Sequence, residues 1–348
     1  METLWYWLLA FMLIMYVLLD GFDLGAGIIH LFVARDDRER RTVLSAIGPV
    51  WDGYEVWLIA AGGTLFFAFP AVYAASFSGF YLPLIIILWL LMLRGLGIEF
   101  RHQIDHPLWR AFWDAVFALG SIFLSIFFGA ALGNIIRGVP LNKEGFFFEP
   151  LWTTFTVVPE GGILDWFTAT LAAVSFSTLT VHGANFLAVK TEGEIQQRAR
   201  GAARIALTGV VGFSIIAVIG TLTIRPGLWS NFTAFPAGFV LPFLGVLGLA
   251  GMVYYNRTRQ DGRALISSLL FIAAMLASTA FGLFPALLPA STDPAFGLTA
   301  FNAAAKEYAL GIGISWWLVG IVLALAYLTY LEITFRGKVK PPEAGEGY

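Results

Sequence analysis

LLAFMLIMYVLLDGFDLGAG (residues 8–27) decides the fold class, because an unbroken apolar run leads straight into two carboxylates and three glycines. A helix that spans a bilayer needs about 20 mostly apolar residues. The whole chain of 348 residues is 58% hydrophobic and 13% charged, with a mean hydropathy of +0.78, whereas an average soluble domain is about 25% charged. The sequence therefore predicts an integral membrane protein that carries Asp20 and Asp23 at membrane depth.

Nine segments are long and apolar enough to cross a bilayer. They are residues 4–33, 50–73, 77–98, 111–136, 163–190, 203–224, 235–255, 264–288 and 309–334. We therefore predict an all-α polytopic membrane protein with nine transmembrane helices.

The basic residues are divided unevenly between the two sets of connecting loops. All but four of the 21 Lys and Arg residues lie on the side that carries the first loop and the C-terminal tail. Loops on the cytoplasmic side of a membrane are enriched in Lys and Arg. The bias predicts an N-terminus outside and a C-terminus inside. The four exceptions are Arg137, Lys143, Arg225 and Lys306.

A weak internal repeat suggests two bundles of four helices. The first and fifth spans both carry polar residues and glycine in their inner halves, and both lead into a charged loop. Membrane helices with charged inner flanks all share such features, so a chance likeness stays open. The predicted units are 1–137 (first bundle), 138–162 (external loop), 163–288 (second bundle), 289–334 (external loop and a peripheral ninth helix) and 335–348 (cytoplasmic tail).

Five carboxylates from three predicted spans share the inner half of the membrane. Asp20 and Asp23 are spaced i, i+3 and so share one helix face, as do Asp52 and Glu55, while Asp114 begins the fourth span. A charge at the centre of a membrane helix costs about 2.5–3.5 kcal/mol, so such groups face protein or water, pair with Arg, or hold a proton. A chain of such carboxyl groups is typical of a proton relay.

Structural ion pairing is the alternative interpretation of the same residues. For Glu55, Arg94 and Glu99 we predict structural pairing, because each lies near a helix end. For Asp52 the sequence favours a functional role. For Asp20 both interpretations stay open, and the same holds for its neighbour Asp23.

No metal site is predicted. The chain has no cysteine, which excludes disulfides, iron–sulfur clusters and thiolate sites. It has four histidines. His30 and His182 both lie in inner portions of predicted helices, so a haem between them is conceivable, although a lone histidine in a bundle more often bonds to a neighbour. A stand-alone di-haem cytochrome b is therefore disfavoured. The net charge of −2 predicts no nucleic-acid partner.

Six stretches resemble subunit II of cytochrome bd-type quinol oxidases, over nearly the whole chain. GFDLG followed by WDGxEVWL is a specific pair of motifs in the order and spacing of that family. The region 138–166 is similar to the cyanide-insensitive variants. The six stretches are DGFDLGAG (20–27), the region 35–63 with WDGYEVWL, FPAVYAASFSGFY (69–81), GVPL (138–141), GILDW (162–166) and FPALLPAST (284–292).

The resemblance implies a partner and a reaction. Subunit II pairs in a heterodimer with a subunit I that carries all the haems: two of type b and one of type d, or a b in place of d. The complex lies in the bacterial cytoplasmic (inner) membrane as part of the respiratory chain, oxidises quinol and reduces O₂ to water. This subunit alone is then inactive and binds no cofactor, although some members hold a quinone in subunit II. The other implied partners are membrane lipid and a small single-span accessory subunit.

The resemblance also implies residue roles. The acidic residues of GFDLG and WDG have been proposed to line a proton path from the cytoplasm, which maps onto Asp20, Asp23 and Asp52 and extends to Asp114. Trp57 resembles the residue at the mouth of a proposed oxygen channel. Some members carry His before WDG where this chain has Val50. A relay that needs this histidine is therefore in doubt here.

A proton-coupled secondary transporter is the alternative function. Its acidic residues would couple ions to a solute, and such proteins break helices at matching mid-membrane places in two halves. The sequence shows no such pair of breaks. An oxidase subunit should co-purify with a coloured haem protein, whereas a transporter should be colourless.

Overall fold

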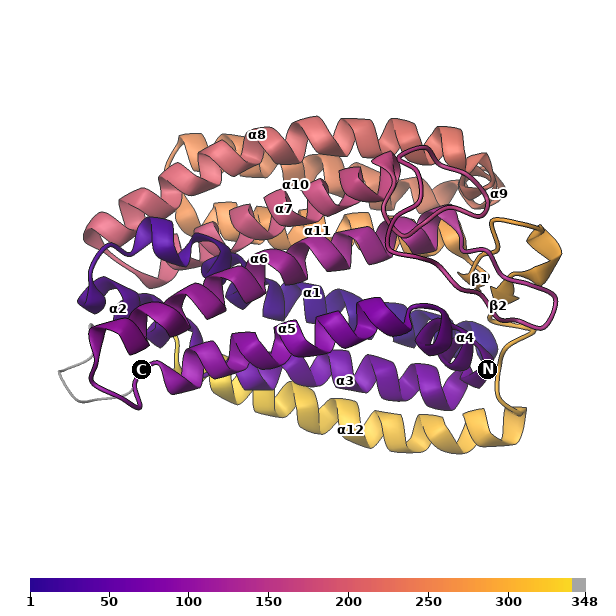
Figure 1. The fold of residues 1–348 in the computed structure, drawn as a ribbon, viewed down its shortest axis with the longest axis horizontal. Coiled ribbons are helices and arrows are strands. Elements are labelled where there is room, and N and C mark those ends of the chain that lie inside the picture. The colour runs from indigo at the N-terminus through magenta and orange to yellow at the C-terminus, as the bar shows by residue number, and fades with distance from the viewer. Residues whose placement is uncertain (340–348) are drawn as a thin grey trace.

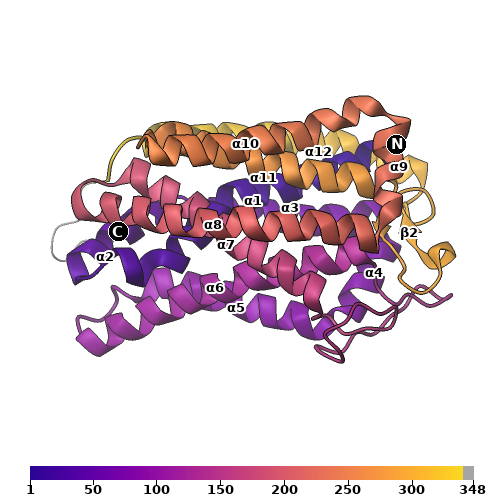
Figure 2. The same cartoon turned by 90° about the horizontal axis from the view of Figure 1, so that it is seen from above.

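The computed structural model describes residues 1–339, so most of the predicted cytoplasmic tail, 335–348, lies outside the described residues. Long helices run side by side along one axis (Figure 1), and a view turned by 90° shows the same arrangement (Figure 2). The helices are α1 (Glu2–Val33), α2 (Asp37–Ile47), α3 (Trp51–Ala68), α4 (Pro70–Gly79), α5 (Tyr81–Phe100), α6 (Pro107–Arg137), α7 (Trp166–Lys190), α8 (Gly193–Ile224), α9 (Trp229–Ala234), α10 (Val240–Arg257), α11 (Asp261–Leu283) and α12 (Glu307–Thr334).

The remaining regular elements are short. Strands β1 (Ala286–Leu288) and β2 (Leu298–Thr299) pair antiparallel. The 3₁₀-helices are η1 (Pro226–Leu228), η2 (Pro236–Phe239) and η3 (Pro294–Phe296). Both strands lie at the end of the bundle where α1 begins (Figure 1).

The all-helical membrane architecture is confirmed. Within residues 1–339, eight helices are long and apolar enough to cross a membrane, and the number is nine if the bent pair α3 and α4 is counted as one span. α12 is the most exposed of these spans, with 6% of its apolar window buried in the chain.

Two predicted spans end differently in the structure. The span 50–73 was expected to be continuous, but α3 stops at Ala68 and α4 turns away by 118° from Pro70. A residue before proline is pushed out of the helical region, and Phe69 has φ −135° and ψ 63°. The span 264–288 stops at Leu283, because Pro285 cannot continue the helix and Ala286 begins β1.

The two ends of the bundle differ in charge and shape. The basic end carries α2, the turn between α5 and α6 and the end of α12. The loop end carries the N-terminus, β1, β2 and the long connection 138–165 (Figure 1). α1 runs from the loop end to the basic end and packs against α3, α6 and α7.

The glycines of DGFDLGAG let α1 approach two neighbours closely. A Cβ added at Gly25 would lie 2.1 Å from the carbonyl oxygen of Leu179 and 2.6 Å from the nitrogen of Gly183. A Cβ at Gly27 would lie 2.1 Å from the Oγ of Ser121 on α6. Small residues allow such backbone contact between membrane helices.

Gly25→Ala and Gly183→Ala are each expected to destabilise the bundle. An extra methyl group must push α1 away from α7, and overpacking of a tight core costs about 1–3 kcal/mol. Thermal unfolding of the detergent-solubilised protein measures the effect. Gly201→Ala in α8 is the control, because no atom lies within 4 Å of its added Cβ. Equal melting temperatures for all three variants would contradict this packing.

Candidate functional site

A fully buried arginine joins three helices in the half of the bundle nearer to the basic end. Nη1 of Arg94 on α5 donates to Oδ1 of Asp20 on α1 at 2.7 Å, and Nη2 donates to Oε1 of Glu55 on α3. Arg94 and Asp20 have no exposed surface, and the Glu55 side chain is 23% exposed. One cation therefore faces two carboxyl groups.

Asp23 lies one turn along α1 from this ion pair, fully buried. Neither of its carboxyl oxygens has a hydrogen-bond partner among residues 1–339, and the same is true of Oδ2 of Asp20 and the hydroxyl of Tyr16. Buried polar groups are normally hydrogen-bonded. A carboxyl group in such a place must be reached by water or hold a proton. Asp23 therefore has the properties of a group that exchanges protons.

Asp114 on α6 lies in a different environment. His30 contacts its Oδ1 through Nε2 at 2.8 Å, Arg101 donates Nε to Oδ1 at 2.6 Å, and Arg40 donates Nη1 to Oδ2 at 3.0 Å. Burial lowers the pKa of Arg101, but Asp114 and Asp37 outweigh that effect and raise it above its ordinary value. This carboxylate is saturated with donors, which suits a fixed charge that ties α1, α2 and α6 together.

Asp52 and Trp57 lie on opposite sides of α3. Asp52 is exposed, on the same helix face as Val56 and Ile59, which are 51% and 73% exposed. Trp57 is buried against Phe11 of α1, with the ring centroids 5.8 Å apart. The structure thus separates Asp52 from the buried pair Asp20 and Asp23.

Glu99 lies at the end of α5 and accepts a hydrogen bond from Nε1 of Trp51 at 3.3 Å. Of the three residues predicted to form structural ion pairs, Glu55 and Arg94 form one with each other. The Glu99 contact joins the end of α5 to the start of α3.

The two inner histidines contact different neighbours. His182 on α7 contacts Oγ of Ser268 at 2.7 Å and the carbonyl of Leu18 at 3.0 Å, and its ring stacks on Phe22. His30 belongs to the Asp114 cluster. Residues 1–339 contain no group of three or more His, Cys, Asp or Glu residues that could hold a metal ion. The contacts of His30 and His182 are those of histidines that hydrogen-bond neighbouring helices together.

Three polar contacts could not be predicted from the sequence. Tyr54 on α3 donates to Glu332 on α12, and these residues are 278 positions apart. Arg137 at the loop end is buried with Glu149 at 2.5 Å and with Asp165. Asp165 also caps the first turn of α7. Its position directly before the start of this helix was the one local feature of the sequence that pointed to the Arg137 ion pairs.

Glu149→Gln is expected to flatten the pH dependence of stability. Burial raises the pKa of Glu149 from 4.5 to about 7, and Asp165 adds to the rise while Arg137 opposes it. A raised folded-state pKa stabilises the fold fully below the unfolded pKa, and this contribution is lost as the pH rises through the folded pKa. The loss is at most about 3 kcal/mol. Melting temperatures between about pH 5 and about pH 8 should fall further in the wild type than in the variant. Parallel curves would contradict the prediction.

Comparison with known proteins finds matches over nearly the whole chain. The family model described as "Cytochrome bd terminal oxidase subunit II" matches residues 1–335. The chain is 33% identical to "Probable cytochrome oxidase subunit 2" of Haemophilus influenzae, over 97% of this chain and 95% of that one. It is 32% identical to "Cytochrome bd-I ubiquinol oxidase subunit 2" of Escherichia coli K12, over 95% and 92%. It is 30% identical to "Cytochrome bd ubiquinol oxidase subunit 2" of Bacillus subtilis, over 97% and 94%.

A solved structure shares the fold. A chain in the structure of bd oxidase from Geobacillus thermodenitrificans superposes with a TM-score of 0.74 at 20% identity, covering 96% of this chain and 98% of that one.

Proposed function

This chain belongs to the cytochrome bd terminal oxidase subunit II family, and from this premise we propose that it supplies protons to a haem-bearing subunit I that oxidises quinol and reduces O₂. Relatives named as ubiquinol oxidase subunits support ubiquinol as the reductant. The multi-pass architecture and the bacterial relatives support the cytoplasmic membrane as its location. The Lys and Arg bias supports a cytoplasmic location for the basic end.

Proton uptake from the cytoplasm follows from the chemistry of the complex. Reduction of one O₂ to two water molecules consumes four protons and four electrons, and oxidation of quinol supplies the electrons. Uptake on one side and release by quinol on the other would charge the membrane without a pump. The observation that carries the proposal is Asp23, a fully buried carboxyl group without a hydrogen-bond partner in residues 1–339, one turn from the Asp20–Arg94 pair.

The carboxyl groups divide into three roles. Asp23 and Asp20 exchange protons in the interior, with Arg94 holding the charge of Asp20 and Glu55. Asp52, on the exposed face of α3, hands protons to the partner subunit. Asp114 stays ionised and fixes the ends of the helices, and Trp57 borders an oxygen route between α1 and α3.

We also propose that the units 1–137 and 163–288 are equivalent halves. In the first, His30 on α1 contacts Asp114 on α6; in the second, His182 on α7 contacts Ser268 on α11. In each unit a histidine on the first long helix thus contacts a residue near the start of the last long helix. The close contact of Gly25 with Gly183 joins the two first helices.

Affinity purification of this chain from the membrane tests the proposal. A second, haem-bearing subunit and a visible haem spectrum should co-purify, and quinol-dependent O₂ consumption should be present. The chain expressed alone should be colourless and inactive. A colourless, self-sufficient protein with proton-coupled solute uptake would instead support the transporter interpretation.

A further inference from the structure

A pocket opens at the basic end, beside the hydrogen bond between Tyr54 and Glu332. Its volume is about 200 Å³, and its walls come from α3, α7, the end of α12 and the residues that follow. Tyr54, Lys190 and Glu332 line it, together with the apolar side chains of Phe186 and Leu331. The pocket therefore brings ionisable groups from three helices to one place.

Tyr54 connects this pocket to the interior. Its hydroxyl donates to Oε1 of Glu332 at 2.5 Å. Glu332 is exposed, whereas Tyr54 is 1% exposed. The side chain of Leu331 on α12 packs against the backbone of Gly53 on α3: an added Cβ would lie 3.3 Å from the Leu331 Cδ1.

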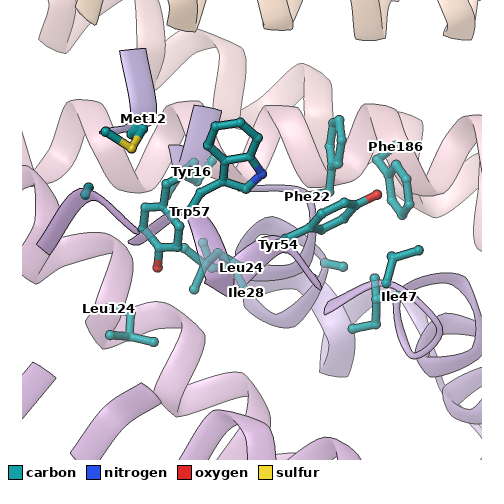
Figure 3. Close-up of a cluster of buried hydrophobic side chains, with 14 of the residues drawn as sticks. Met12, Tyr16, Phe22, Leu24, Ile28, Ile47, Tyr54, Trp57, Leu124 and Phe186 are labelled. Carbon is teal, nitrogen blue, oxygen red and sulfur yellow. The ribbon is translucent and has the colours of Figure 1, made fainter. Parts of the chain in front are cut away.

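The ring of Tyr54 packs against Phe22, the residue before Asp23. Figure 3 shows Tyr54 beside Phe22, the residue before Asp23, with its hydroxyl directed towards the side of Phe186. The Phe22 and Tyr54 ring centroids lie 6.4 Å apart. Asp23 follows Phe22 on the same turn of α1 and is fully buried. The three acidic groups thus run from the exposed surface to full burial.

We propose that Glu332 collects protons at the cytoplasmic surface and that Tyr54 passes them inward to Asp23. This inference rests on the proposed function and adds the residues at which protons enter the route. The protonated carboxyl group of Glu332 gives its proton to the Tyr54 oxygen, and the tyrosine releases its own hydroxyl proton towards Asp23, directly or through water. Rotation of the hydroxyl then restores the bond to Glu332. No charge is left on the tyrosine, and Asp23 gains the proton that Glu332 lost.

The surroundings of Glu332 suit a proton-collecting group. Lys190 on α7 faces the pocket and donates to the carbonyl of Phe335, and Lys338 donates to the carbonyl of Thr191. Arg336 also lines the pocket. Glu332 is exposed in this pocket, so bulk water reaches its carboxyl group directly.

The experiment compares Glu332→Gln, Glu332→Asp and Tyr54→Phe in the complete oxidase complex. Quinol-dependent O₂ consumption is followed from about pH 6 to about pH 9, because pH–rate profiles report the groups that transfer protons. Glu332→Gln and Tyr54→Phe should slow turnover severalfold at high pH, where bulk protons are scarce, and little at low pH. Glu332→Asp should restore most of the rate. Glu307→Gln, at the other end of α12, is the matched control and should match the wild type.

Two outcomes separate this inference from the proposed function. If Asp23→Asn slows turnover but the pH–rate profile of Glu332→Gln superposes on that of the wild type, proton entry through Glu332 is contradicted. The proposed role of Asp23 in the interior then still holds. If Asp23→Asn has no effect, the proposed function itself fails. A Glu332→Gln enzyme slowed equally at every pH, with lost haem, would also overturn the inference, because that pattern marks a structural role.

Discussion

Asp23→Asn is expected to slow quinol-dependent O₂ reduction about tenfold or more in a complex that still assembles with its haems. A positioned acid or base contributes about 10²–10⁴-fold to a proton transfer, and asparagine cannot carry a proton. The substitution is nearly isosteric, and neither oxygen of Asp23 has a hydrogen-bond partner among the described residues that could be lost. Turnover per haem, from O₂ consumption and the visible spectrum, measures the effect.

Asp105→Asn is the matched control for that variant. Asp105 is also at the basic end, but its side chain is 92% exposed, where it pairs with Arg110. Exposed ion pairs contribute about 0–1 kcal/mol, so turnover and assembly should be unchanged. An Asp23→Asn enzyme that assembles and turns over at the wild-type rate would remove Asp23 from the route.

Arg94→Met is expected to prevent stable assembly. The substitution removes the cation from Asp20 and Glu55 and leaves a fully buried carboxylate unpaired. Breaking a buried ion pair by removing one partner costs about 3–5 kcal/mol, a large part of the stability of a typical domain. The measurement is the yield and the melting temperature of the purified complex.

A triple variant separates loss of charge balance from loss of packing. Combining Arg94→Met with Asp20→Asn and Glu55→Gln removes the unpaired charges, so much of the lost stability should return. Turnover should stay low, because Asp20 is part of the proposed route. If Arg94→Met alone melts like the wild type, the buried ion pair does not hold α1, α3 and α5 together.

The sequence was sufficient for the architecture because bilayer thickness imposes a simple rule. Apolar length alone predicted the spans. The break at Phe69 was missed, since Pro70 is compatible either with a kinked span or with the start of a new helix. Only the packing of the chain decides between the two.

The partners of the buried carboxyl groups could not be predicted, because they come from distant parts of the chain. Asp20 and Arg94 are 74 positions apart, and so are Arg40 and Asp114. All five carboxylates looked equivalent by depth, yet the structure saturates Asp114 with donors and leaves Asp23 without a partner in residues 1–339. The rotation of each helix about its own axis decides which neighbours a carboxyl group meets. The sequence does not reveal this rotation, because each span is nearly uniformly hydrophobic around its circumference.

Proton uptake measured on one side of the membrane tests the central claim most directly. The complete oxidase is reconstituted with the basic end facing a compartment that holds a pH-sensitive dye, and an O₂ pulse is given with excess quinol. The wild type should take up protons from that compartment in step with O₂ reduction, and Asp23→Asn should slow both together. Wild-type uptake from that side in the Asp23→Asn enzyme would contradict the claim that protons reach the oxygen reaction through this chain.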